Sequence, residues 1–290
     1  MSTDSIHISL SAEPIFSVGS LPITNSMFTS VIVSLILITF AVVVRSQLKE
    51  TDRPTGVQNF AEWLIETLFS FVYSVTLDAK KAAQFLPIVS TFFLFIVLNN
   101  WLGLLPGVGS ITTPVFESSH SPETIVAEVG HDEVVFEETA NESALESLSQ
   151  ENTQEVHSPR APLFRPGTAD LNTTLALALI SIFATQYFGL KSQKLSYLKK
   201  FVNFESPIMF FVGILELISE FAKIISFAFR LFGNIFAGEV LLVVIAALIP
   251  LGIPLPFYGL EIFVGFIQAL VFSMLTLVFI NMATISHDSH

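Results

Sequence analysis

The sequence predicts an all-α, multi-pass membrane protein with five membrane-crossing helices and one interfacial amphipathic helix. The last two helices are expected to be long, steeply slanted and paired as an antiparallel hairpin. Of the 290 residues, 52% are hydrophobic and only 13% are charged, about half of the charged fraction usual for soluble domains. The charges gather in a few segments between long apolar runs, and Lys and Arg are unevenly distributed among the connecting loops. These three observations are typical of membrane spans joined by polar loops.

Four segments in the first two thirds of the chain have the pattern of helices. Residues 27–44, 85–105 and 171–190 are apolar runs of about the length that crosses the hydrocarbon core of a bilayer. Residues 60–75 form a shorter segment, in which apolar residues recur at helical spacing opposite Glu62 and Glu66. This segment is therefore expected to lie in the membrane interface rather than to cross the membrane.

The apolar segment 208–248 is too long for one upright crossing. As a single helix its 41 residues would extend ~60 Å, whereas the hydrocarbon core is ~30 Å thick. A break at Gly233 and Asn234 would leave 14 residues after it, too few for a second crossing. We therefore predict one strongly tilted helix, followed by a Pro-rich turn at 250–256 and an antiparallel partner helix at 257–285.

The basic residues predict the orientation, because most of them lie in two connections on the same side of the membrane. They are Arg45, Lys49, Arg53, Lys80 and Lys81 after the first span, and Lys191, Lys194, Lys199 and Lys200 after the third. By the positive-inside rule both connections are cytoplasmic, which places the N-terminus outside and the C-terminus inside. The first residues resemble neither a signal peptide nor a transit peptide, so we expect a bacterial plasma (inner) membrane.

The chain is expected to divide into five parts. They are an external N-terminal segment (1–26), the first two spans with the amphipathic helix between them (27–110), a poorly ordered acidic external insert (111–165), the third span with a basic cytoplasmic loop (166–206), and the slanted hairpin (207–290). Eleven acidic residues between Glu117 and Glu155 produce most of the net charge of −12. The insert is either simply solvated or serves to concentrate protons and cations near the membrane. No basic patch points to nucleic acid.

Ionisable side chains within the hairpin are the strongest functional signal. They are Glu216, Glu220, Lys223, Arg230, Glu239 and Glu261. A charge at mid-membrane costs about 2.5–3.5 kcal/mol on insertion scales, so these groups need partners or water. Helical spacing places one set of polar residues on a single face: Glu216, Ser219, Lys223, Ser226, Arg230 and Asn234. Glu239 points to the opposite face. Because the charged groups need partners or water, the hairpin is expected to line an ion path or a polar interface.

Antiparallel pairing predicts which groups of the two long helices meet. A register that sets Arg230 level with Gln268 also sets Glu239 nearly level with Glu261. Two neighbouring carboxylates in an apolar setting resist double ionisation, so this pair is expected to share a proton. Alternatives remain at each position. Lys223 can simply pair with Glu216 or Glu220, Gln268 can serve as an interhelical hydrogen bond, Arg230 can extend toward water, and the two carboxylates can be hydrated separately.

Several segments resemble one protein family. Residues 229–239 are FRLFGNIFAGE, which is similar to the signature of the a subunit of F-type ATP synthases. Residues 266–272, FIQALVF, resemble the final helix of that family, and residues 21–26, 99–107 and 168–174 also match. The similarity extends from near the N-terminus to near the C-terminus and is interrupted only by the acidic insert.

The resemblance implies a membrane-embedded stator subunit of a rotary ATP synthase, with a role in ATP synthesis and proton transport. Arg230 would be the stator arginine, which faces the carboxylates of a rotating c-subunit ring and separates two proton half-channels. The implied pathway residues are Glu239, Glu261, Gln268, Asn234, Glu216, Ser219 and Lys223. The implied partners are the c ring, the b subunits of the peripheral stalk and, through them, the catalytic head.

The chain is not expected to be an enzyme by itself or to hold a cofactor or a metal. It has no GxxxxGK[ST] nucleotide-binding motif, and the His residues of the external segments are scattered. It departs from the family where many members place one His and one Glu, since here both positions, Glu239 and Glu261, are Glu. A proton-coupled secondary transporter and a non-conducting scaffold are the alternative functions. A transporter usually has an internal repeat and broken helices, and neither is evident in this sequence.

Overall fold

The computed structural model of the chain describes residues 12–18, 21–48, 56–105, 112–114, 160–162, 164–194, 197–198, 201, 207–248, 252 and 254–285. Most of the acidic insert lies outside the described residues. The first half contains the antiparallel strands β1 (Pro14–Val18) and β2 (Leu21–Thr24), followed by helices α1 (Asn25–Gln47), α2 (Val57–Thr76) and α3 (Ala79–Gly103). The second half contains the short paired strands β3 (Thr112–Pro114) and β4 (Arg160–Pro162), the 3-10 turn η2 (Gly167–Ala169), and helices α5 (Leu171–Gln193), α7 (Pro207–Leu248) and α8 (Pro254–Thr284).

Polar side chains fix where three of these helices begin. The Thr24 hydroxyl accepts a hydrogen bond from the Met27 amide at the start of α1, and Asp78 accepts one from the Lys80 amide at the start of α3. Asp170 accepts one from the Asn172 amide at the start of α5. These caps satisfy amides that have no partner within the helix, and they place each boundary at a polar residue rather than at the first apolar one.

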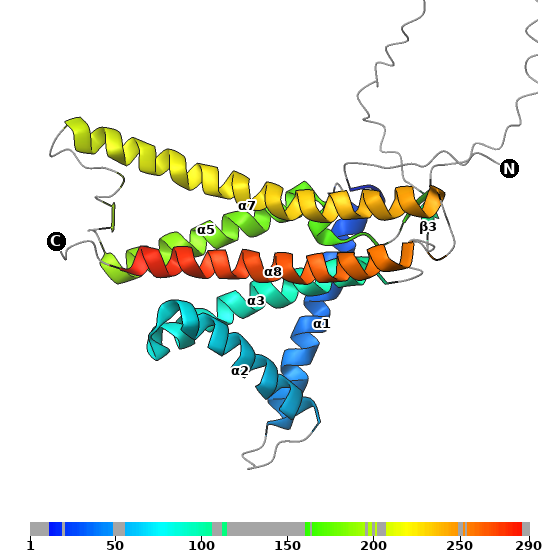
Figure 1. Cartoon of the computed structure of the whole chain (residues 1–290), viewed down its shortest axis with the longest axis horizontal. Helices are drawn as coiled ribbons and strands as arrows, with labels where there is room; N and C mark the ends of the chain where they lie inside the picture. Colours follow the sequence, from blue (N-terminus) through cyan, green and yellow to red (C-terminus); the bar gives the residue numbers. More distant parts are fainter. Residues whose placement is uncertain are drawn as a thin grey trace, which may run out of the picture.

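The two long helices α7 and α8 are antiparallel, lie close together where α7 ends and α8 begins, and spread apart toward their other ends (Figure 1). Helix α5 packs against both of them, and α3 packs beneath α8. Helices α1 and α2 diverge from this bundle and meet at their far ends (Figure 1). The main core lies between α3, α5, α7 and α8, where the rings of Phe92 and Phe227 lie 5.5 and 5.0 Å from that of Phe272.

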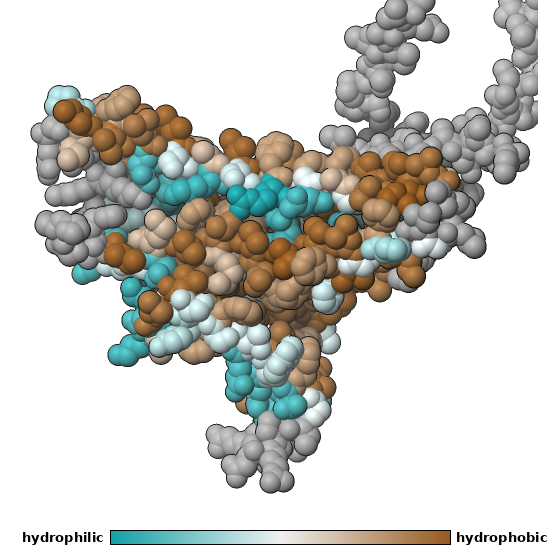
Figure 2. All heavy atoms as spheres, in the orientation of Figure 1, coloured by the Kyte–Doolittle hydropathy of each residue, from teal (hydrophilic) through white to brown (hydrophobic). Residues whose placement is uncertain are grey.

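The outside of the bundle is apolar. Large hydrophobic side chains are exposed along α1, α2, α5, α7 and α8, and hydrophobic atoms cover much of the visible face (Figure 2). Five of the described helices, α1, α3, α5, α7 and α8, are long and apolar enough to cross a membrane. The chain is therefore an all-α, multi-pass integral membrane protein, as the sequence predicts.

The observed boundaries differ from the sequence predictions in a systematic way. Helix α3 begins at Ala79, whereas the apolar run predicted a start at residue 85. The prediction missed the first turns because they contain the polar residues Lys80 and Lys81. Helix α7 is continuous through Gly233 and Asn234, as its length argument requires. Strands β1 to β4 were not predicted, because such short pairings have no sustained alternation of apolar and polar residues.

A buried amide joins α3 to α8 and provides a test of this packing. Asn100, which is 2% exposed, donates a hydrogen bond of 2.9 Å to the carbonyl of Gly265 and accepts one from the Thr168 hydroxyl. Asn100→Ala would remove both bonds and leave the Thr168 hydroxyl buried without its acceptor. We expect it to destabilise the subunit by about 1–3 kcal/mol, measured as a lower midpoint of thermal unfolding of the purified complex.

Trp101 supplies the matched control, since its indole donates to the Ile262 carbonyl of the same helix at 3.1 Å but the residue is 39% exposed. Trp101→Phe should change the midpoint much less than Asn100→Ala. Equal midpoints for Asn100→Ala and the wild type would contradict the role of this amide in joining the helices.

Candidate proton pathway

A buried ion pair lies at the end of the bundle that carries β1 and β2. Arg165, which is 4% exposed, donates a hydrogen bond of 3.2 Å from its Nε to the carboxylate of Glu239 on α7. Its guanidinium also lies 5.9 Å from the centre of the Phe236 ring. The Glu239 side chain is 31% exposed, so one side of the pair remains accessible. A carboxylate within a membrane helix thus has a cation from another segment as its direct partner.

The segment that carries Arg165 reaches this position because Gly167 has no side chain. A Cβ atom at Gly167 would overlap the Ser30 hydroxyl and lie only 2.6 Å from the Asn99 amide oxygen. Residues 164–170 therefore pass close to α1 and α3, and Arg165 lies beneath α7. The glycine permits a close approach of backbone to side chains, which is a common use of this residue.

Glu261 occupies a notch between the two long helices. It is 7% exposed, and its carboxylate lies against Gly238, so that a Cβ atom at Gly238 would overlap the carboxylate. Gly238 directly precedes Glu239 in the chain. The structure therefore brings Glu261 to nearly the level of Glu239, but the direct partner of Glu239 is Arg165, which the register argument did not include.

A buried polar cluster lies behind these two acids and connects α1, α3, η2 and α8. The Ser26 hydroxyl donates to Asp170 at 3.3 Å, and Ser30 donates to Asn99 at 3.3 Å. Asn100 and Thr168 complete the cluster through the bonds already described. Because these side chains satisfy one another, they form a rigid support for the segment that holds Arg165.

The middle of the hairpin contains Arg230, Asn234 and Gln268. Arg230 is exposed on α7, and its Nη2 lies 3.4 Å from the Ser226 hydroxyl. Asn234 donates a hydrogen bond of 2.6 Å to the side-chain oxygen of Gln268 on α8. Gln268 is 5% exposed, and its amide nitrogen has no hydrogen-bond partner within the described residues. The structure thus pairs Gln268 with Asn234, one helical turn beyond Arg230.

A second polar group lies toward the opposite end of α7 and contains Lys223, Glu220 and, from the segment after α5, Tyr197. Lys223 donates a hydrogen bond of 2.8 Å to the buried Glu220, and its ammonium nitrogen lies 5.0 Å from the centre of the Phe279 ring. This is the helical-spacing pair that the sequence offered as the simple alternative for Lys223. Ser219 is exposed on the same helix, and Glu216 is partly exposed.

Tyr197 adds a hydroxyl to this second group. It is 4% exposed and donates a hydrogen bond of 2.9 Å to the side-chain oxygen of Gln186. Burial raises the pKa of Tyr197 to about 12, and the negative charges of Glu220 and Glu216 contribute to the shift. Its hydroxyl therefore remains a neutral donor at physiological pH.

Figure 2 shows these polar side chains as a band of hydrophilic atoms that follows α7 on the side facing α8, between apolar surfaces.

Two site residues, Arg165 and Tyr197, were not predicted from the sequence. Both lie outside the apolar helices, where a polar residue is unremarkable. One feature of the sequence could have pointed to Arg165. It is one of few basic residues on the side predicted to be external, and it lies five residues before Asp170. Within the described part of the chain, no group of three His, Cys, Asp or Glu residues has the arrangement of a metal site.

The fold and these side chains define a class: a multi-pass membrane protein with two separated polar groups and an exposed arginine between them. Residues 27–281 match the family model described as ATP synthase A chain. The chain is also similar to "ATP synthase subunit a" of Gloeobacter violaceus, with 31% identity over 266 residues that cover 92% of this chain and 86% of the relative. The chain belongs to the ATP synthase A chain family. It is a non-catalytic membrane subunit of the ATP synthase complex that acts in proton translocation.

The notch at Gly238 gives a direct test of how Glu261 is positioned. Gly238→Ala would place a methyl group on the Glu261 carboxylate and force it to move. We expect passive proton flux through the membrane sector in vesicles to fall on the order of tenfold, equivalent to about 1.4 kcal/mol in the barrier. Gly259→Ala is the control, because a Cβ atom there meets nothing within 4 Å and the residue is exposed on α8. If both variants conduct like the wild type, the position of Glu261 does not matter for flux.

Proposed function

We propose that this subunit provides two proton half-channels that lead to and from carboxylates on a rotating c ring, with Arg230 between them. The observation that carries the proposal is the division of polar side chains along the hairpin. Arg165, Glu239 and Glu261 form one group, Lys223, Glu220 and Tyr197 form the other, and Arg230 lies between them on an exposed face of α7. A continuous channel would not need this division.

Arg230 separates the two groups by electrostatics. A carboxylate that passes the guanidinium is stabilised in its ionised form, so it gives up its proton there. The same positive charge repels a proton that would otherwise pass directly from one group to the other. The residues beside Arg230 on this face include Gly233 and Ala237, both exposed, which allow a partner helix to approach closely.

The entry half-channel contains Glu239, Glu261, Asn234 and Gln268. Glu239 is accessible on one side and held by Arg165 on the other, and Glu261 lies further between the helices. Asn234 and Gln268 continue from this acid site toward Arg230. In this arrangement a proton passes from external water to the acids and then to the ring carboxylate. Arg165 positions Glu239 and compensates its charge.

The exit half-channel contains Glu216, Ser219 and Lys223 near the opposite end of α7. The Lys223–Glu220 pair and the Tyr197 hydroxyl lie beside it. By the Lys and Arg distribution this end is cytoplasmic, with the N-terminus outside and the membrane a bacterial plasma membrane. The partners are the c ring at the exposed face of α7 and the b subunits of the peripheral stalk, which connect the subunit to the catalytic head.

Substitution of Arg230 tests the central element. Arg230→Ala should abolish ATP-driven proton pumping by the reconstituted complex while the detached catalytic head still hydrolyses ATP. Arg230→Lys keeps the charge but loses the planar guanidinium and should also be severely impaired. Ser226→Ala removes only the weak 3.4 Å partner of Arg230 and should retain most of the pumping. Pumping by Arg230→Ala at a rate near that of the wild type would refute the stator role.

A double-mutant cycle tests the Arg165–Glu239 pair. Arg165→Gln removes the cation that contacts the Glu239 carboxylate, and Glu239→Gln removes one charged partner of the buried guanidinium. Loss of one partner of a buried pair costs up to ~3–5 kcal/mol, and less is expected here because Glu239 is 31% exposed. Each single variant should lower both passive proton flux and thermal stability.

The double variant Arg165→Gln/Glu239→Gln has two neutral amides that can hydrogen-bond to each other. Its thermal midpoint should lie closer to that of the wild type than either single variant does, while its proton flux stays low because the carboxylate is missing. Additive losses of stability would show that the two side chains act independently.

A further inference from the structure

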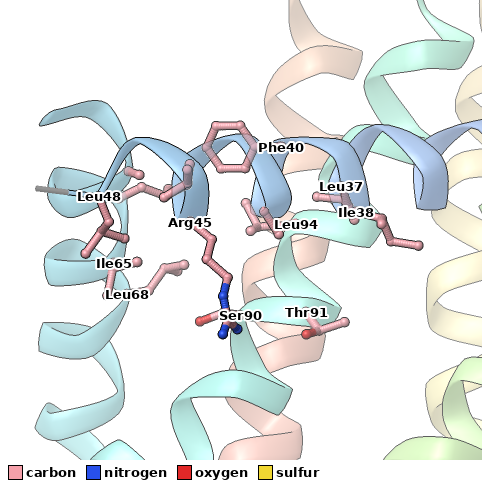
Figure 3. A pocket seen from close by; sticks show the side chains of 14 residues that line it. Leu37, Ile38, Phe40, Arg45, Leu48, Ile65, Leu68, Ser90, Thr91 and Leu94 are labelled. Carbon is pink, nitrogen blue, oxygen red and sulfur yellow. The ribbon is translucent and has the colours of Figure 1, made fainter. Parts of the chain in front are cut away.

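A cavity opens between α1, α2 and α3, where α1 and α2 diverge from the bundle (Figure 1). Its volume is about 470 Å³. The walls are mainly apolar, with Leu37 and Phe40 from α1, Leu64 and Leu68 from α2, and Leu94 from α3 (Figure 3). The cavity plays no part in the proton pathway described above.

One cation extends into this apolar space. Arg45, in the last turn of α1, is the charged side chain of the lining; it is exposed and extends from α1 in the direction of α3, whose Ser90 also lines the cavity (Figure 3). Within the described residues Arg45 has no ion pair, and Ser90 has no side-chain hydrogen bond. The neighbouring Thr91 hydroxyl already donates to the Pro87 carbonyl at 2.7 Å. The cavity thus combines an uncompensated guanidinium and a hydroxyl with walls of aliphatic and aromatic side chains.

The occupant must satisfy both parts of this lining. A soluble anion would neutralise Arg45 but leave the apolar walls exposed, and a plain hydrocarbon chain would cover the walls but leave the guanidinium unpaired. An α-helix of another subunit would cover the apolar walls, but it would pair with Arg45 only through an acidic side chain of its own. An anionic lipid supplies both a flexible hydrocarbon chain for the walls and a negative charge for the guanidinium.

We propose that this cavity binds one anionic phospholipid, with an acyl chain between α1, α2 and α3 and the phosphate at Arg45 and Ser90. The guanidinium is suited to phosphate because it presents several donors in a plane. Arg45 lies at the end of α1 that the charge distribution assigns to the cytoplasm, and that leaflet is the one rich in anionic lipids. The bound lipid fills the space left between α1, α2 and α3 and strengthens the packing of α1 and α2 against α3.

Photolabelling of the intact complex tests the proposal. The purified ATP synthase is reconstituted in vesicles of phosphatidylcholine with a minor fraction of phosphatidylglycerol, and either lipid carries a photoactivatable acyl chain. We expect the phosphatidylglycerol probe to label peptides from α1, α2 and α3 about fivefold more than the phosphatidylcholine probe at equal concentration, from the contribution of one basic residue near the surface. Arg45→Gln should reduce this preference to none, and Arg45→Lys should retain part of it.

Two further variants distinguish lipid binding in this cavity from a general attraction of the protein to anionic lipid. Lys80→Gln removes a nearby exposed cation that does not line the cavity, and it should leave the preference unchanged. Ala41→Trp adds a ring to the lining and should reduce labelling by both probes. Assembly of each variant complex is checked on a native gel, and Arg45→Lys keeps the test valid if Arg45→Gln fails to assemble.

Three results would overturn the proposal. Equal labelling by the two probes in the wild type would show that Arg45 does not select an anionic lipid. Loss of labelling with excess inorganic phosphate would show a site for a soluble anion. A photoactivatable residue at position 41 that crosslinks to another subunit instead of lipid would show that a protein helix fills the cavity.

Discussion

A charge in the hydrocarbon of a membrane needs an opposite charge, hydrogen bonds or water, and the arrangement of this subunit depends on that constraint. Glu239 lies in an apolar helix and is held by Arg165, which reaches it from outside the helices. Lys223 is held by Glu220 three residues earlier on the same helix. Arg230, by contrast, is exposed on the surface of α7, and among the described residues its side chain has one weak partner. The proposed mechanism supplies its opposite charge from the ring carboxylates.

The same constraint explains why the hairpin consists of two unbroken helices. A continuous helix satisfies its own backbone groups, so that α7 can run ~63 Å through apolar surroundings without exposing them. The polarity of the pathway then comes from side chains alone, and its geometry depends on how closely the helices approach. Gly238 permits the approach that places Glu261 between them. The glycine thus allows Glu261 to lie beside α7, close to Glu239, while α7 remains a continuous helix.

The membrane spans could be predicted from the sequence, because a long apolar run is a property of a single segment. The continuity of α7 followed from length alone, since no second crossing fits after Gly233. The sequence was not sufficient for contacts between distant segments. Arg165 and Glu239 are 74 residues apart, and only the folding of 164–170 beneath α7 brings them together. A register argument compares two helices and therefore cannot include a partner from a third segment, so Arg165 was missed.

Arg165 and Arg45 show two solutions to one problem. Each is an arginine at the edge of the apolar bundle, but Arg165 is buried, whereas Arg45 is exposed and lines a cavity between helices. For Arg165 the protein supplies a carboxylate, and the pair lies in the pathway. Around Arg45 the described residues supply apolar walls and the Ser90 hydroxyl of the same cavity but no ion pair, and the proposed lipid supplies the negative charge. Because α3 contributes Asn100 to the support of the acid site and Leu94 to the cavity, a lipid that holds α1 and α2 against α3 also steadies the scaffold on which the proton pathway is built.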